Sequence, residues 1–204
     1  MIFTITWKLL LVFSVSYIIG SIPTGYLIVK AKKGTDIRKV GSGSTGATNV
    51  KRVLGTKWFF VVMLLDAIKG AVPVLLAVKY FNFLACLGLG PVIAALGVII
   101  GHSKSVFLNF TGGKSVAAGV GTILALCWPV GLSVAAVWGI ITYSTKYVSL
   151  GSVIAMTLAP ILMNAFNQND YYICFAALGA VYVILMHRAN IKRLLEGKEN
   201  KVRK

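Results

Sequence analysis

Two glycine-rich polar stretches hold the residue types that bind phosphate. Residues 41–55 read GSGSTGATNVKRVLG, which combines glycines with short hydroxyl and amide side chains and a Lys51-Arg52 pair. Residues 111–115 read TGGKS. Glycines let backbone amides approach an anion, and an arginine can hold a phosphate through two parallel hydrogen bonds. Both stretches therefore predict anion-binding sites.

Two nucleotide-binding motifs match these stretches only in part. Gly41-x-Gly43-x-x-Gly46 has the dinucleotide spacing, but that motif follows a strand, and here an apolar run precedes it. Gly113-Lys114-Ser115 ends like a P-loop, but that motif needs a glycine where this chain has Leu108. We interpret the second stretch as a turn opening a membrane helix, with free amides and the positive end of the helix dipole available to an oxyanion.

Two further pairs of polar residues have helical spacing. Asp66 and Lys69 lie three residues apart inside an apolar run, where they either form an ion pair that packs the bundle or serve a site. His187 and Asn190 have the same spacing at the start of a basic tail. His187 is either an interfacial residue or a catalytic residue.

The composition is that of a membrane protein. The chain has 204 residues, of which 57% are hydrophobic and 13% charged, with a mean hydropathy of +0.83. A soluble domain carries about 25% charged residues. We therefore expect an all-α integral membrane protein with a single domain over residues 1–204. The net charge of +16 lies in clusters between apolar runs, which is typical of cytoplasmic loops and not of a nucleic-acid partner.

Seven apolar runs predict about seven transmembrane helices. They cover residues 7–29, 58–80, 83–100, 115–127, 129–141, 148–166 and 171–186. Gly20 and Pro23 in the first run indicate close packing or a broken helix. The distribution of Lys and Arg places the N-terminus outside and the C-terminus in the cytoplasm. Because the runs between residues 115 and 141 are short, five helices with re-entrant pieces are an alternative.

Several kinds of chemistry have no matching residues. Cys86, Cys127 and Cys174 lie in apolar runs without metal-ligand spacing, so we expect packed side chains and no metal or cofactor. The chain contains no HExxH motif, no serine nucleophile elbow and no carboxylate pair typical of glycosidases.

Three stretches in order resemble the motifs of the bacterial acyl-phosphate:glycerol-3-phosphate acyltransferase family, PlsY. They are GSGSTGATNVKRVLG, GHSKSVFLNFTGGKSVAAGVG and HRANIKRLLEGKE, with DAIKG between the first two. The resemblance implies a multi-pass enzyme of the bacterial inner membrane with its active site at the cytoplasmic face. It implies transfer of a fatty acyl group from acyl phosphate to the sn-1 hydroxyl of glycerol 3-phosphate, giving lysophosphatidic acid and phosphate without a cofactor. We expect a monomer in the lipid bilayer.

The resemblance also implies roles for individual residues. The implied catalytic residues are Ser42, Arg52, Lys114, His187 and Asn190, and the implied substrate-binding residues are Gly43, Thr48, Asn49, Arg52, Gly112, Gly113, Lys114 and Glu199. The chain departs from the usual pattern at Thr111, Ser115 and Ala118, where members usually have a cation, a glycine and a threonine.

A mechanism follows as a hypothesis. The donor phosphate meets Lys114 and the glycine turn, while Arg52 holds glycerol 3-phosphate with help from His187 and Asn190. Catalysis then comes from proximity and from neutralising two anions. Either His187 or a phosphate oxygen of the donor takes the hydroxyl proton. A membrane permease for a small phosphorylated anion is the alternative function.

Overall fold

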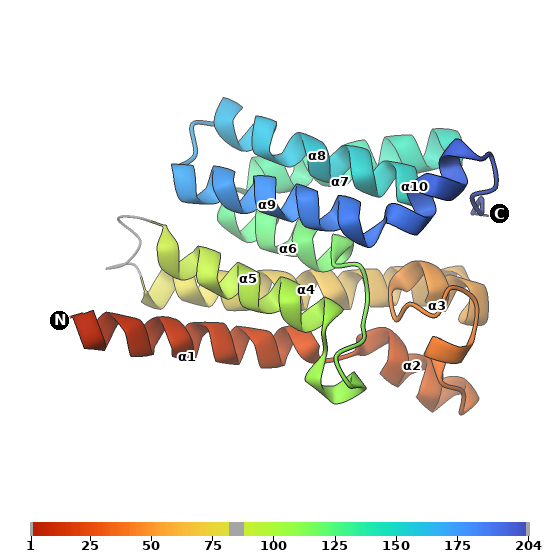
Figure 1. The fold of residues 1–204 in the computed structure, drawn as a ribbon, viewed down its shortest axis with the longest axis horizontal. Coiled ribbons are helices and arrows are strands. Elements are labelled where there is room, and N and C mark those ends of the chain that lie inside the picture. Colours follow the sequence, from red (N-terminus) through yellow and green to blue (C-terminus); the bar gives the residue numbers. More distant parts are fainter. Residues whose placement is uncertain (1, 82–87, 203–204) are drawn as a thin grey trace. The chain divides into compact units, whose positions relative to one another are not determined.

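The computed structural model describes residues 2–81 and 88–202, and these residues form helices joined by short loops (Figure 1). The described residues contain no strand, only an isolated bridge between Ser105 and Thr111. Contacts divide the chain into two compact units, Met1–Thr122 and Ile123–Lys204. The expected all-α fold is thus confirmed, and the expected single domain stays a prediction.

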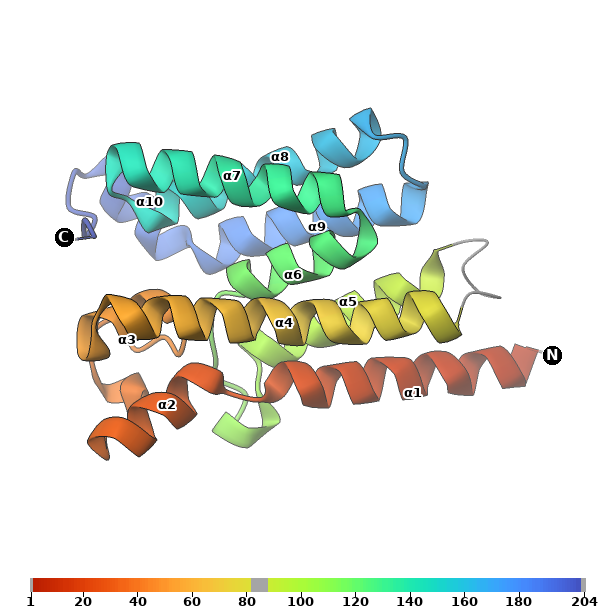
Figure 2. The same cartoon turned by 180° about the vertical axis from the view of Figure 1, so that it is seen from behind.

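The first unit contains α1 to α5, two short 3₁₀ helices and most of α6. Their bounds are α1 Ile2–Ser21, α2 Thr24–Lys33, η1 Ile37–Lys39, α3 Ala47–Leu54, α4 Thr56–Tyr80, α5 Leu89–Ser103, η2 Val106–Leu108 and α6 Val116–Leu126. The first residues of the predicted run 83–100, including Cys86, lie outside the described residues. The loop predicted before residue 58 contains an unexpected helix, α3, which packs against α4 (Figure 2).

The first apolar run is broken, as Pro23 indicated. Helix α1 ends at Ser21 and α2 begins at Thr24. Lys69 on α4 donates from Nζ to the Ile22 carbonyl at 2.7 Å, and the Thr24 hydroxyl donates to Asp66 Oδ1. A helix break in an apolar environment needs such partners for its backbone groups. The charged pair on α4 therefore stabilises the break between α1 and α2.

Small residues let α1 and α5 approach closely. A Cβ added to Gly97 would lie 2.7 Å from the Phe13 carbonyl oxygen, and one added to Gly101 would lie 2.3 Å from the Tyr17 carbonyl oxygen. Close backbone approach at small residues is the usual way for helices to pack where lipid replaces water. This packing fixes the end of α5, from which the second glycine-rich stretch continues.

The second unit contains the end of α6 and four further helices. These are α7 Trp128–Thr145, α8 Val148–Ala165, α9 Asp170–Met186 and α10 Arg188–Leu195. Helix α8 packs against both α7 and α9, and α9 and α10 are bent by 62° relative to each other. Cys127 is buried as expected, whereas Cys174 is exposed, so the prediction of a packed side chain is wrong for Cys174.

Within residues 2–81 and 88–202, three helical segments are long and apolar enough to cross a membrane. They are Thr6–Lys33, Thr56–Tyr80 and Val148–Ala165, and the bent pair of α9 and α10 makes up to four. Shorter apolar helices cover Leu89–Ser103 and Val116–Leu126. The structure thus supports a helical membrane protein, and the count of seven spans stays a prediction.

Candidate active site

Asn49 holds the first glycine-rich stretch together from within. It lies near the start of α3 and is 1% exposed. Its Nδ2 donates to the carbonyl oxygens of Val40 and Ser44 at 2.9 Å each, and to that of Ile37 at 3.3 Å. Its Oδ1 accepts the Ser42 N–H at 3.0 Å. Both kinds of polar group on this side chain are therefore used inside the loop, which makes Asn49 a positioning residue.

The glycines of this stretch shape the loop, and three of the loop amides have acceptors within it. Gly41 and Gly43 have φ angles of 61° and 71°, which favour glycine, and a Cβ at Gly41 would lie 2.1 Å from Asn49 Oδ1. The N–H groups of Ser42, Gly43 and Gly46 bond to Asn49 Oδ1, the Val40 carbonyl and Ser44 Oγ. These three amides therefore have internal acceptors, and phosphate binding by the other amides of the stretch stays a prediction.

At the first stretch, exposed side chains are groups available to bind an anion. Thr48 and Arg52 lie four residues apart on one face of α3, and Asn49 and Val50 lie on the buried face. Arg52 is exposed, and its Cδ would lie 3.6 Å from a Cβ at Gly41, so its stem passes the glycine loop. Ser42 is exposed on that loop. Helix α3 thus presents an arginine and a hydroxyl beside the exposed serine.

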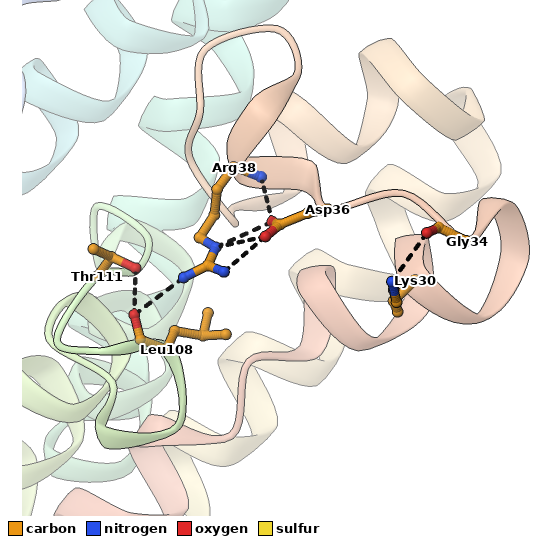
Figure 3. Close-up of polar contacts among 6 residues, drawn as sticks. All are labelled: Lys30, Gly34, Asp36, Arg38, Leu108 and Thr111. Carbon is orange, nitrogen blue, oxygen red and sulfur yellow. Dashed lines mark hydrogen bonds and ion pairs between the residues drawn. The ribbon is translucent and has the colours of Figure 1, made fainter.

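An arginine that the sequence analysis did not single out joins the segment before the first stretch to the segment before the second. Arg38 forms a forked ion pair with Asp36, with Nη2 2.7 Å from Oδ2 and Nε 3.0 Å from Oδ1. Its Nη1 donates to the Leu108 carbonyl at 3.3 Å, and the Thr111 hydroxyl donates to the same oxygen at 2.7 Å (Figure 3). Hydrogen bonds from Arg38 lower the pKa of Asp36 to about 2. The carboxylate therefore stays charged at neutral pH and keeps Arg38 in place.

The second stretch folds back onto the end of α5. The Gly113 N–H donates to the His102 carbonyl at 3.1 Å. The sequence analysis expected this amide to be free, and it is not. A Cβ on Gly112 would lie 2.2 Å from the His102 carbonyl oxygen, and one on Gly113 would lie 2.1 Å from His102 Nε2. Lys114 follows, partly buried, two residues before α6 begins. Only glycines fit at these two positions, and they bring the Lys114 backbone close to α5.

Ser115 shows how the chain accommodates a departure from the family pattern. Its φ of 59° lies in the left-handed region, where a glycine is the least strained residue. Its buried hydroxyl donates to the Ile99 carbonyl at 2.9 Å. This hydrogen bond offsets part of the cost of the backbone conformation, so the turn is kept with serine in place of glycine.

The third stretch belongs to the second unit. His187 lies at the bend between α9 and α10, is 4% exposed, and its Nδ1 is 2.8 Å from the Val183 carbonyl oxygen. A carbonyl accepts only from an N–H, so in a neutral ring the proton is on Nδ1 and Nε2 is an acceptor. This tautomer is the one that a general base would need.

Glu199 binds three donors from different parts of the second unit. Its Oε1 accepts from Asn190 Nδ2 at 2.6 Å and from the Ser149 hydroxyl at 2.8 Å, and its Oε2 accepts from Arg193 Nε at 2.7 Å. Burial by itself would raise the pKa of Glu199, but these three hydrogen bonds outweigh it and lower the pKa. Glu199 therefore holds the C-terminal segment against α8 and α10 and orients Asn190.

The structure joins the first two stretches in one unit and places the third in the other. Sequence reasoning missed Arg38, His102 and Ser149, which support the predicted residues through contacts distant in the chain. The only available signal was the occurrence of Arg38 and His102 beside the two glycine-rich stretches. Nothing in the sequence around Ser149 distinguishes it from other serines in apolar runs.

Comparison with known proteins gives a consistent family assignment. A family model described as glycerol-3-phosphate acyltransferase matches residues 10–197. A glycerol-3-phosphate acyltransferase of Trichormus variabilis is 45% identical over 201 residues, covering 92% of this chain and 89% of that protein. One from a Synechococcus strain is 48% identical over 189 residues, covering 91% of this chain and 89% of that protein.

Two solved structures are also similar. Both are crystal structures of PlsY (YgiH), an integral membrane glycerol 3-phosphate acyltransferase. The glycerol 3-phosphate form has a TM-score of 0.90 at 37% identity and covers 96% of each chain. The lysophosphatidic acid form has a TM-score of 0.86 at 34% identity and covers 96% of this chain and 95% of that one. On the family match and these identities together, the chain belongs to the glycerol-3-phosphate acyltransferase family.

Proposed function

We propose that this protein transfers a fatty acyl group from acyl phosphate to the sn-1 hydroxyl of glycerol 3-phosphate. The products are lysophosphatidic acid and inorganic phosphate. The family match over residues 10–197 carries this conclusion, since that range contains all three anion-binding stretches apart from Glu199. The acyl group of a mixed anhydride is already activated, so the enzyme has to hold two anions together and orient them.

We propose a division of roles among the site residues. Arg52 binds a substrate phosphate, with Ser42 and Thr48 adding hydroxyl groups, because these residues lie on or beside the accessible face of α3. Gly112, Gly113 and Lys114 form the second phosphate site. His187 is a candidate general base, and Asn190 a further substrate ligand. Gly43, Asn49 and Glu199 shape and hold these elements.

The membrane topology is part of the same proposal. The chain is an all-helical membrane protein, and its helices include three to four long enough to span. We propose seven spans in the bacterial inner membrane, with the N-terminus outside and the C-terminus and active site on the cytoplasmic face. The clustering of Lys and Arg in the loops supports this orientation. The protein acts as a monomer without a cofactor.

One assay tests the activity directly. Purified protein is incubated with palmitoyl phosphate and labelled glycerol 3-phosphate, and lysophosphatidate is separated and counted. We expect product with palmitoyl phosphate and none with palmitoyl-CoA. The Arg52→Ala variant, in the same preparation, controls for contaminating acyltransferases. Product formation that is equal in this variant and in the wild type would contradict the proposed site.

The same protein in liposomes tests the alternative of an anion permease. Buried charges in a membrane segment can mark a transport path. Here Asp66 and Lys69 pair with each other at 2.9 Å and with the α1–α2 break, so packing explains their presence without transport. Uptake of labelled glycerol 3-phosphate into the liposomes, together with no lysophosphatidate, would overturn the enzyme assignment.

A further inference from the structure

A buried polar cluster lies behind the glycine turn of the second stretch. Asp66 and Lys69 on α4 form an ion pair at 2.9 Å, with side chains only 2% and 8% exposed. His102, in the last turn of α5, is also buried. Its Nδ1 lies 3.7 Å from Asp66 Oδ1 and has no hydrogen-bond partner among the residues that the structure describes. A buried polar atom without a partner is costly, so this one needs an explanation.

The opposite side of the same imidazole supports the turn. The Gly113 Cα faces Nε2 so closely that a Cβ there would lie 2.1 Å from it. The His102 carbonyl accepts the Gly113 N–H at 3.1 Å. The ring therefore lies between the Asp66 carboxylate on one side and the Gly113 backbone on the other. A displacement of the ring would displace the turn.

We propose that His102, oriented by Asp66, is a positioning residue for the phosphate-binding turn Gly112-Gly113-Lys114. The inference rests on the proposed function, since it concerns the same site. Asp66 Oδ1 lies 3.7 Å from Nδ1, just beyond hydrogen-bond distance, and the ion pair with Lys69 holds the carboxylate in place. The intramembrane ion pair thus serves the active site as well as the packing of α4.

The pairing explains why both charges are kept in an apolar helix. An ion pair that only packed helices would be replaceable by apolar residues of similar volume, often without loss of stability. A carboxylate that orients an imidazole is not replaceable in this way, because the imidazole would lose its acceptor. Removing both charges together should therefore impair function beyond the stability that is lost when the Ile22 carbonyl and the Thr24 hydroxyl lose their partners.

Two substitutions test this distinction. His102→Ala removes the support under Gly113, and the double variant Asp66→Leu with Lys69→Met removes the acceptor while avoiding an unpaired buried charge. We expect both variants to raise the KM for the substrate whose phosphate this turn binds, by about tenfold or more. Small displacements of binding groups are costly. The kcat at saturation should change less. Thr122→Ala, which removes a buried hydroxyl bonded within α6 to Gly119, is the matched control and should keep wild-type kinetics.

A coupling measurement separates positioning from general damage. If Asp66 acts through His102, adding His102→Ala to the double variant should worsen the KM by less than twofold. His102→Asn, whose amide keeps a donor near the Nδ1 position, should recover part of the loss. Independent, multiplying effects of the two changes would overturn the proposal. Wild-type KM values in either His102→Ala or the double variant would overturn it too.

Binding measurements keep this inference separate from the activity itself. Calorimetric titration of the purified variants with glycerol 3-phosphate and with inorganic phosphate is carried out beside the kinetics. If the wild type makes no lysophosphatidate, the proposed function fails. Weaker binding of either probe by His102→Ala, with wild-type binding by Thr122→Ala, would still support the positioning role. Unchanged binding of both probes would refute it.

Discussion

Replacing Asn49 by alanine should destabilise the protein even without substrate. The side chain makes four hydrogen bonds within the first stretch, three from Nδ2 and one to Oδ1. Each intramolecular hydrogen bond contributes about 0.5–1.5 kcal/mol net. Because one contact is long at 3.3 Å and the three donor contacts share two N–H groups, we expect a loss of about 2–4 kcal/mol in the free energy of unfolding. For a chain of this size, the melting temperature should fall by about 5–15 °C.

The assay is thermal unfolding of purified protein in detergent, with and without glycerol 3-phosphate. Asn164→Ala is the matched control, because Asn164 is exposed near the end of α8. Asn49→Asp should be at least as harmful as alanine, since its carboxylate would face three carbonyl oxygens. A melting temperature within about 2 °C of the wild type for Asn49→Ala would refute the positioning role. A direct contact between Asn49 and the substrate would then be the better explanation.

Three other substitutions test the remaining parts of the site. Arg52→Ala should raise the KM for glycerol 3-phosphate by about 100-fold or more, because a bidentate phosphate ligand is lost, and Arg52→Lys should recover only part of it; an unchanged KM rules out this role. His187→Ala should lower kcat by about 100-fold if the imidazole is the general base, whereas near-normal turnover at saturating substrates assigns the proton to a donor phosphate oxygen. Asp36 has a lowered folded-state pKa, so its stabilisation is complete above its usual pKa of 3.8 and is lost as the pH falls toward about 2. The free energy of unfolding of the wild type should therefore fall over that pH range in unfolding measurements. In Asp36→Asn, the share of this fall that comes from Asp36 should be absent.

The helices of the fold were predictable because lipid-facing segments must be long apolar runs. The run at 148–166 matches α8, Val148–Ala165, almost residue for residue. Helix α3 was not expected, because its glycine borders and its basic pair made it look like part of a loop. Its apolar positions Ala47, Val50 and Leu54 have helical spacing, but the run is too short to stand out in a chain of longer apolar segments.

The chemistry of the site was predictable as residue types and not as contacts. Arg52 and the Gly-Gly-Lys turn were singled out from composition and spacing alone. Whether an amide is free depends on which acceptor the folded chain brings to it, and the Gly113 amide meets the carbonyl of His102, which is eleven residues earlier in the chain. Glu199 likewise meets Ser149 fifty residues away. Such pairings are set by tertiary packing, which local spacing does not encode.

The break between α1 and α2 has a consequence for how the chain enters the bilayer during synthesis. The N-terminal segment leaves the ribosome first. The Ile22 carbonyl and the Thr24 hydroxyl are therefore already present when the segment carrying Asp66 and Lys69 follows. In the folded protein the Ile22 carbonyl accepts from Lys69, and the Thr24 hydroxyl donates to Asp66. Both partners of the α4 charges thus precede them in the chain. The order of residues along the chain thus matches the order in which these partners are needed.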